Sequence, residues 1–490
     1  MSLSIVSEIE LTGFEKSCCV YGDWVTICHA AHLTGDHTVI ANNIQYVIPH
    51  LLQRHPRMRT RIHIKGYQHL LQSFDYDEKQ LNINLFYSIV YTTDQSSWEK
   101  IVENECNRDP YSENGTNIFP LFYFMLVLDE NRSLSNDNPF HLLLFSNHCA
   151  SDGRSGYILL NDFLTLITSS DLHDRIEPLN TEVIPCLTEL GPRPNGLSFR
   201  FLSWIGEKQF RRELRKLNHP RIPIKVVRLD VKPTPFHHQP IKSNFLFTSS
   251  SSTLYSRLHD KCRSQQLTLT GPLFGCLLLA LHHCFPTKKS NDRTLTPSTI
   301  EIPADMRSRL PQSSLTSQTV GFCVSVSDVK IEKQYPLHST PFWVLAKKCM
   351  KAINKTITVK DLYFGIHFFN NIISNQTKFD RFSRCHPNGH AAELCLSNIG
   401  KYPYSCDYNQ GQLKLRGLHV VNSCSVYYLS AIIFITCAGD GQLDFSLTHV
   451  IENEEKAFEF LHYYVRLIEL CADADMTMTL DQLLTAAKST

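Results

Sequence analysis

The chain lacks an excess of charge of either sign. Its 490 residues include 48 Lys and Arg and 47 Asp and Glu, which gives a formal net charge of +1. Proteins that bind nucleic acids usually carry a basic excess or a basic stripe, and neither is present. Hydrophobic residues make up 42% and charged residues 19% of the chain, which is typical of a globular protein with a large core. We therefore expect a folded protein without a nucleic-acid partner.

Motifs that bind metals or nucleotides are also missing. The 17 cysteines include no Cys-x-x-Cys pair, and the chain has no His-Glu-x-x-His, no clustered carboxylates and no Walker loop. We therefore expect no metal site and no permanently bound cofactor. The cysteine count is odd and the residues are scattered from Cys18 to Cys471, which favours free thiols in a reducing compartment. The cytoplasm is the simplest such location.

Long hydrophobic runs are absent as well. The first residues, MSLSIVSEIELTG, have neither the basic segment nor the apolar stretch of a secretory signal. The most apolar stretch, residues 267–285, is interrupted by Pro272, His282 and His283 and falls short of the ~20 apolar residues of a membrane span. It predicts a buried helix, and we expect no transmembrane segment.

Strand-like and helix-like patterns alternate through both halves of the chain. Short apolar segments typical of buried strands lie at residues 119–129, 140–147, 244–248, 298–303, 393–398, 425–436 and 442–450. Helical spacing of apolar residues lies at 39–54, 153–168, 251–265, 271–284 and 453–470. Nine prolines between residues 170 and 245 mark a connector. We expect an α/β fold with an N-terminal subdomain over residues 1–185, a proline-rich connector over 186–243 and a C-terminal subdomain over 244–490.

The strongest chemical motif lies between a buried strand and an amphipathic helix. It is His148-Cys-Ala-Ser-Asp152-Gly153. A histidine at a strand end can project into a cleft, Asp152 can cap the helix, and Gly153 allows a backbone geometry that other residues resist. A core histidine followed by an ordinary helix cap would give the same pattern. A similar strand ends at His449 before the closing helix, which either chance or two diverged copies of one unit would produce.

At this motif the chain resembles the acyltransferases of the chloramphenicol acetyltransferase-like superfamily, which share HxxxDG after a hydrophobic strand. Three other segments are similar to the family's and lie in the same order: LLQRHPRMRTRI at 51–62, IPADMRSRLPQSSLTSQTVGFC at 302–323 and LSNIG at 396–400. Many relatives have a second histidine where this chain has Asn147, and the plant-type DFGWG motif is absent. The resemblance is therefore closest to alcohol acetyltransferases, polyketide-associated acyltransferases and condensation domains.

The resemblance implies a fold and a set of site residues. The fold would consist of two subdomains, each a mixed sheet flanked by helices, with an active-site channel between them. His148 would be the general base, without an acyl-enzyme, and a neutral imidazole suits that role near neutral pH. Asp152 would point away from the substrate and pair with an arginine, for which Arg307 is the preferred candidate and Arg309 the second.

The second half would supply the remaining groups of the site. The resemblance implies that Ser397 donates a hydrogen bond to the oxyanion of the tetrahedral intermediate, supported by Asn398 and Gly400. The alternative is that this segment is only a strand-ending turn. A nucleophilic Cys149 beside His148 is disfavoured, because adjacent residues on an extended strand point to opposite faces.

The implied reaction is transfer of an acyl group from acyl-CoA, used as co-substrate, to a small-molecule alcohol or amine. The residues that bind the donor cannot be located from the sequence. One alternative is a condensation-type enzyme that uses a carrier-protein thioester, and another is a catalytically silent binding protein on the same fold. We expect a monomer.

Overall fold

The structure is a computed structural model. It describes residues 4–19, 24–75, 81–93, 97–108, 117–130, 139–169, 182–190, 201, 204–205, 208, 224–225, 242–286, 293–295, 297–310, 315–375, 377–378, 394–424, 429–439 and 441–489. Most of the predicted proline-rich connector therefore lies outside the described residues. Its first residues, 186–190, pack against the N-terminal half, where the backbone N–H of Leu187 donates a hydrogen bond to Glu15.

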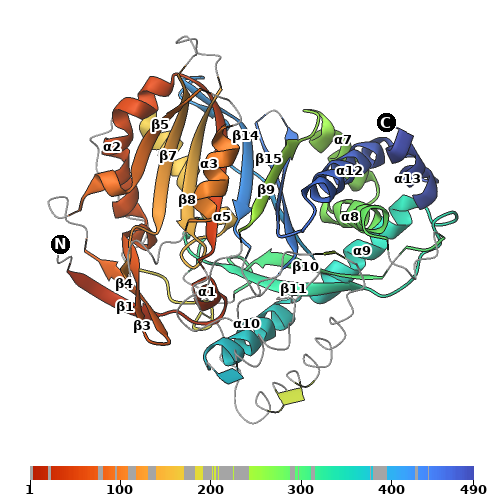
Figure 1. The fold of residues 1–490 in the computed structure, drawn as a ribbon, viewed down its shortest axis with the longest axis horizontal. Helices are drawn as coiled ribbons and strands as arrows, with labels where there is room; N and C mark the ends of the chain where they lie inside the picture. Colours follow the sequence, from red (N-terminus) through yellow and green to blue (C-terminus); the bar gives the residue numbers. More distant parts are fainter. Residues whose placement is uncertain are drawn as a thin grey trace.

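The first large sheet has six strands in the order β13-β14-β2-β8-β7-β5. They are β2 (Thr26–Gly35), β5 (Tyr87–Thr92), β7 (Phe122–Asp129), β8 (Phe140–Asn147), β13 (Asp407–Tyr408) and β14 (Leu413–Asn422). Strands β7 and β8 are nearly continuous apolar runs because both faces of the sheet are covered. Helices α2 (His37–Arg54) and α5 (Gly153–Ile167) pack on one face, and α3 (Ser97–Cys106) packs on the other (Figure 1).

The second large sheet also has six strands, in the order β11-β10-β12-β15-β16-β9. They are β9 (Asn244–Ser249), β10 (Ser298–Asp305), β11 (Val324–Ile331), β12 (Leu394–Lys401), β15 (Ala431–Ala438) and β16 (Gln442–His449). One face is apolar and is covered by five helices (Figure 1): α7 (Leu254–Ser264), α8 (Thr270–Cys284), α9 (Phe342–Thr356), α12 (Glu454–Asp473) and α13 (Leu480–Ser489). The other face of the sheet is turned toward the N-terminal half.

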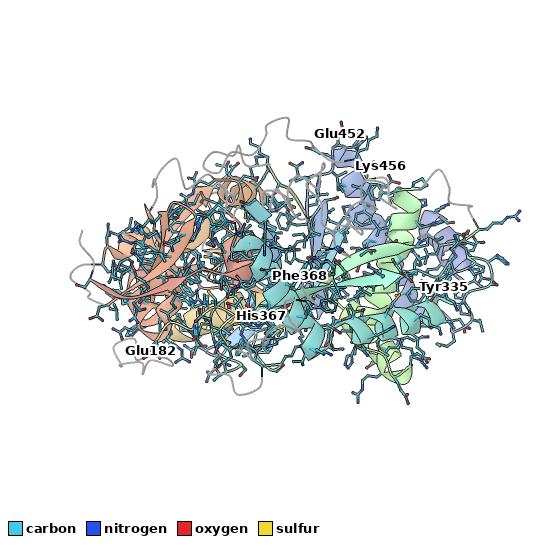
Figure 2. All side chains as sticks on the ribbon, turned by 90° about the horizontal axis from the view of Figure 1, so that it is seen from below. Glu182, Tyr335, His367, Phe368, Glu452 and Lys456 are labelled. Carbon is cyan, nitrogen blue, oxygen red and sulfur yellow. The ribbon has the colours of Figure 1, made fainter. Side chains whose placement is uncertain are left out.

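Smaller elements close the lower side of the molecule. A four-stranded sheet has the order β1-β4-β3-β6. These elements are β1 (Ile5–Glu10), α1 (Gly13–Ser17), η1 (Pro56–Arg59), β3 (Thr60–Lys65), β4 (Gln68–Phe74), η2 (Ile83–Leu85), β6 (Asn117–Ile118) and α10 (Val359–Ile373). Figure 2 views the molecule from below and shows His367 and Phe368 of α10 near the centre, between the two halves. The ring of Phe369 stacks on Phe14 of α1 at 4.7 Å, so α1 and α10 join the halves from beneath.

The two large sheets repeat one four-strand unit. In the first sheet, β5 is parallel to β7, β7 is antiparallel to β8, and β8 is antiparallel to β2. In the second sheet, β12, β15, β16 and β9 have the same order and the same directions. His148 follows β8 five positions before α5 begins, and His449 ends β16 five positions before α12 begins. The shared topology favours diverged copies over chance.

One segment of the C-terminal half of the chain crosses into the sheet of the N-terminal half. Strands β13 and β14 come from the C-terminal half of the sequence, yet they extend the N-terminal sheet, where β14 pairs with β2 from Leu413↔Gly35 to Asn422↔Ile27. Figure 1 shows β14 beside the strands of the first half. The predicted C-terminal subdomain, residues 244–490, therefore contributes two strands to the first sheet, while β9–β12, β15 and β16 form the second. The sequence analysis also missed β2 and β14 as strands.

The apolar stretch at 267–285 forms the buried helix that the sequence predicts. Twelve of the fifteen residues of α8 are buried, between α9 and α12. Among the described residues, no helix has the length and apolar character needed to cross a membrane. The cysteines that the structure describes are all free thiols.

Candidate active site

His148 is the first residue after β8 and is held at two points. Its backbone N–H donates to the carbonyl of Val25 at 2.8 Å, and its ring Nδ1 donates to the carbonyl of Ser151 at 2.7 Å. The bond to a carbonyl places the proton on Nδ1 and leaves the lone pair on Nε2. Nε2 has no partner among the described residues, and the side chain lines a cavity. Burial lowers the pKa of His148, so the ring is neutral near pH 7 and Nε2 can accept a proton.

Asp152 does not face the cavity. Its side chain is 0% exposed and caps α5 by accepting a hydrogen bond from Ser155 N at 2.7 Å. Its other oxygen accepts from Cys323 N at 2.8 Å. Burial acts to raise the pKa of Asp152, but the Arg307 guanidinium and these backbone donors outweigh it and hold the pKa below its usual value. Asp152 is therefore a buried carboxylate that organises the loop after His148.

Arg307 is the partner of Asp152. Its two terminal nitrogens each donate to one carboxylate oxygen at 3.0 Å, a bidentate pair. The same guanidinium donates to Thr319 O at 3.0 Å and contacts the more exposed Asp305 at 3.0 Å. The second candidate, Arg309, donates instead to Ile357 O at 3.4 Å. The pair spans 155 positions and fastens the His148 loop of the first half to β10 and β11 of the second.

The structure gives Gly153 a different role from the predicted one. The sequence analysis expected a backbone geometry that other residues resist, but the positive-φ glycines do not include Gly153. A Cβ atom at this position would lie 2.9 Å from Cδ1 of Ile399. The absent side chain instead lets β12 approach the start of α5. This close approach brings the second half of the chain to the motif.

Ser397 lies on β12 and lines the same cavity as His148. Its hydroxyl makes no hydrogen bond to any described residue, so it is free to donate to a ligand. Asn398 also borders the cavity, and its amide donates to Thr270 at the start of α8 at 3.2 Å. Gly400 has φ of +88° at an irregularity in the β12–β15 pairing, and its carbonyl accepts from Tyr157 OH at 3.1 Å. The segment is thus part of a strand whose face forms the channel wall, and not only a turn.

The cavity lies between the two halves and has a volume of about 380 Å³, within the range of small-molecule sites. Strands β10, β11, β12 and β15 form one wall, while β2, the His148 loop, α1 and the end of β14 form the other. Its lining residues include His148, Ser397, Arg154, Glu301, Phe322 and Asn422. Sequence reasoning missed Glu301 and Asn422, since neither belongs to a recognisable motif.

His29 supports the motif from the opposite side. Its Nε2 donates to the carbonyl of Gly153 at 3.0 Å. A Cβ at Gly156 would lie 2.1 Å from the ring of His29, so this glycine makes room for the histidine under α5. Burial lowers the pKa of His29 to about 4 and keeps it neutral. The sequence offered one signal for this contact, a second glycine in the first turn of α5.

The other candidates do not reach the cavity. Cys149 is buried and its backbone N–H donates to the side chain of Asn147, which stands where many relatives have a second histidine. Cys149 does not line the cavity with His148. His283 stacks on Tyr463 at 4.1 Å, far from the motif in the fold. Within the described ranges, no group of three or more His, Cys, Asp or Glu side chains could hold a metal ion.

Comparison with known proteins gives one family and a set of structures. The model of the alcohol acetyltransferase family matches residues 229–461. No curated protein matches the chain. The trichothecene 15-O-acetyltransferase TRI3 from Fusarium sporotrichioides is 13% identical, with 95% of each chain covered and a TM-score of 0.70.

Two condensation domains are also similar in structure. The condensation domain of the monacolin K polyketide synthase MokA is 10% identical over 97% of this chain and 100% of that chain, with a TM-score of 0.58. The first condensation domain of the calcium-dependent antibiotic synthetase is 11% identical over 97% and 99%, with a TM-score of 0.58. At these identities the likeness establishes the fold.

Proposed function

The chain has the chloramphenicol acetyltransferase-like fold that its sequence indicated, and from this fold and the alcohol acetyltransferase match we propose an acyl-CoA-dependent acyltransferase that acts on an alcohol or amine. The observation that carries the proposal is the tautomer of His148. Its Nδ1–H is held by the Ser151 carbonyl, so the basic Nε2 is the atom left for a substrate in the cavity. The comparisons support acyl transfer in general. The acyl-CoA donor and the roles of the residues are our proposal.

The proposed reaction is a direct transfer. Nε2 of His148 takes the proton of the acceptor hydroxyl or amine as that atom attacks the thioester carbonyl carbon. The carbonyl π electrons move to oxygen, and the Ser397 hydroxyl donates a hydrogen bond to the resulting oxyanion. The carbonyl then re-forms, the carbon–sulfur bond breaks, and the departing thiolate takes the proton back from Nε2. The products are an ester or amide and the free thiol, and no acyl-enzyme forms.

Asp152 and Arg307 would act as positioning residues. Their bidentate contact holds the loop on which His148 lies against the strand pair β10–β11. Because catalysis requires the base and the oxyanion donor at one carbonyl carbon, the alignment of the two halves matters as much as either side chain. The pair supplies that alignment from outside the cavity.

The test is a panel of acyl-CoA thioesters and small alcohols and amines, with release of free CoA and the acylated product both measured. The proposal expects stoichiometric ester or amide and thiol, and loss of both in His148→Ala. Acyl transfer that persists at the wild-type rate in His148→Ala would refute the assigned base. Hydrolysis of the thioester without acylated acceptor would refute the transfer reaction.

The condensation-domain neighbours favour one alternative donor, a thioester on a carrier protein. Paired assays with the same acyl group on CoA and on a carrier-protein phosphopantetheine distinguish the two. A kcat/KM at least tenfold higher for the carrier-bound thioester would replace acyl-CoA as the donor. A silent binding protein would bind thioester or acceptor and transfer nothing from either donor.

A further inference from the structure

The cavity holds a carboxyl group that the proposed reaction does not use. Glu301 lies on β10, lines the cavity and is 9% exposed. No described residue donates a hydrogen bond to its carboxyl group. Buried carboxylates are normally paired, since burial without a partner is costly. Asp305, four residues further along the same strand, is an example of a paired carboxylate, because Arg307 contacts it at 3.0 Å.

Sheet register places Glu301 close to the reacting groups. Across the second sheet, Asp328, Glu301, Cys395 and Ile432 stand side by side on four neighbouring strands. Ser397 is two residues beyond Cys395 on β12, which is about 7 Å along the strand. An acceptor whose reacting atom lies beside Ser397 therefore has to extend only about 7 Å along the strands to reach Glu301.

The charges around Glu301 favour a cation. Asp328 is its direct neighbour on β11 and is exposed at the edge of the channel face. Burial, and then the charge of Asp328, raise the pKa of Glu301 to about 8. Lys330 lies two residues beyond Asp328, and its charge does not lower the pKa of Glu301; Cys395 on β12 is a buried thiol. None of these neighbours neutralises Glu301.

The facing wall adds a second unpaired acceptor. Asn422, at the end of β14, lines the cavity and is 8% exposed. Its Oδ1 is buried without a hydrogen-bond partner among the described residues. A carboxylate and an amide oxygen are both acceptors, so the ligand group that suits this part of the cavity is a donor with several N–H bonds.

The other end of the cavity contains the cation Arg154 and the carboxylate Asp305, whose charge is paired with Arg307. Arg154, at the start of α5, lines the cavity with its guanidinium 5.9 Å from the ring centre of Tyr157, and it has no carboxylate partner among the described residues. Gly153 beside it meets Ile399, four residues and about 13 Å along β12 from Cys395. An anionic phosphate-bearing donor is attracted by Arg154 and gains no charge interaction from Glu301. The end of the cavity that contains Glu301 is therefore left for the acceptor.

We propose that Glu301 binds a protonated amino group of the acceptor, so that the acceptor is an amino alcohol or a diamine whose second amine is the cation. This inference rests on the proposed acyl transfer. It specifies which acceptors the channel selects. Glu301 contacts the part of the acceptor that does not react, and His148 contacts the part that does.

The binding test needs no turnover. Calorimetry of the protein without donor compares α,ω-amino alcohols with alkanols of the same chain length. A charge-assisted hydrogen bond predicts about 10- to 100-fold tighter binding of the amino alcohol. Because Glu301 is mostly protonated at pH 7, binding of the ammonium should also release a proton, measurable as a dependence of the heat on buffer ionisation enthalpy. Both effects should disappear in Glu301→Gln, which keeps the shape of the side chain.

The kinetic test uses the ratio of kcat/KM for amino alcohol and alkanol. This ratio should fall about 10- to 100-fold in Glu301→Gln, mainly through KM, and should be retained in Asp305→Asn, the matched carboxyl already paired with Arg307. Glu301→Leu provides a second variant if the first folds poorly. An unchanged ratio, or a wild-type preference for alkanols, would overturn the inference. If no acceptor is acylated at all, the proposed function fails, and the calorimetry still decides whether Glu301 binds amines.

Discussion

Replacing Asp152 with Asn separates the charge of this residue from its role as a helix cap. The Asn side chain can still accept the hydrogen bond from Ser155 N, because Asn caps helices as well as Asp does. Its amide nitrogen, however, would face two donors, Arg307 Nη1 and the backbone N–H of Cys323, which now bond to Oδ2 at 3.0 and 2.8 Å. The substitution therefore removes the buried carboxylate that pairs with the Arg307 guanidinium. It also places the amide nitrogen of Asn, a donor, against two N–H donors.

The size of the effect follows from burial. Removing one partner of a buried ion pair costs about 3–5 kcal/mol, and Asp152 is 0% exposed. Asp305 is the matched control: it contacts the same guanidinium at 3.0 Å, but its side chain is 38% exposed. An exposed pair contributes about 0–1 kcal/mol. Asp152→Asn should thus destabilise the protein at least threefold more than Asp305→Asn.

Thermal and urea unfolding of the three proteins, followed beside acyl transfer, checks this prediction. Because the pKa of Asp152 is held below its usual value, its contribution is present at neutral pH and is lost only as the pH falls through the folded-state pKa. The gap between wild type and Asp152→Asn should therefore persist from pH 8 to about pH 5. Equal destabilisation by the two substitutions would refute the clamp. Lost activity with unchanged stability would show that Asp152 acts on the substrate directly.

Four further outcomes are expected. His148→Ala should lower the transfer rate by ~10²–10⁴-fold with the unfolding temperature little changed, because the ring makes one hydrogen bond; a wild-type rate would contradict this. Since burial lowers the pKa of His148 from 6.5, kcat/KM should stay level as the pH falls to about 6.5 and decline only below the lowered pKa, whereas a decline starting above pH 7 would argue against His148 as the base. Ser397→Ala should lower kcat by ~10²-fold with a small change in acceptor KM, and an unchanged kcat would remove its role as oxyanion donor. Gly153→Ala should reduce activity and stability through the 2.9 Å approach to Ile399, and Ile399→Val in the same chain should restore part of both; no rescue would mean that the contact is not the cause.

Much of the site could be predicted because its signals are local. The strand before His148 contains the apolar run Leu142–Phe145, and the helix after Asp152 repeats apolar residues at helical spacing. A polar residue at such a junction needs a hydrogen-bond partner, and an Asp there finds one by capping the helix. These relations involve residues a few positions apart, so the motif and its two elements follow from the sequence.

The assembly of the channel depends on residues that are distant in sequence. Strand β14 joins the first sheet because its backbone pairs with β2 nearly 400 positions away, and nothing in its composition names that partner. Gly153 gave a misleading signal, since the need for glycine comes from Ile399 of the other half and not from the local backbone.

Contacts between residues that are distant in sequence also decide which charged side chains act on the substrate. The sequence by itself determined the strand, the histidine, the capping carboxylate and the buried helices, because burial patterns and caps are set by neighbouring residues. Only the tertiary structure decided that Asp152 is paired with Arg307 while Glu301 is left unpaired in the cavity. Pairing depends on strand register and side-chain packing between the two halves, and a one-residue shift in register would turn each side chain to the other face of its sheet.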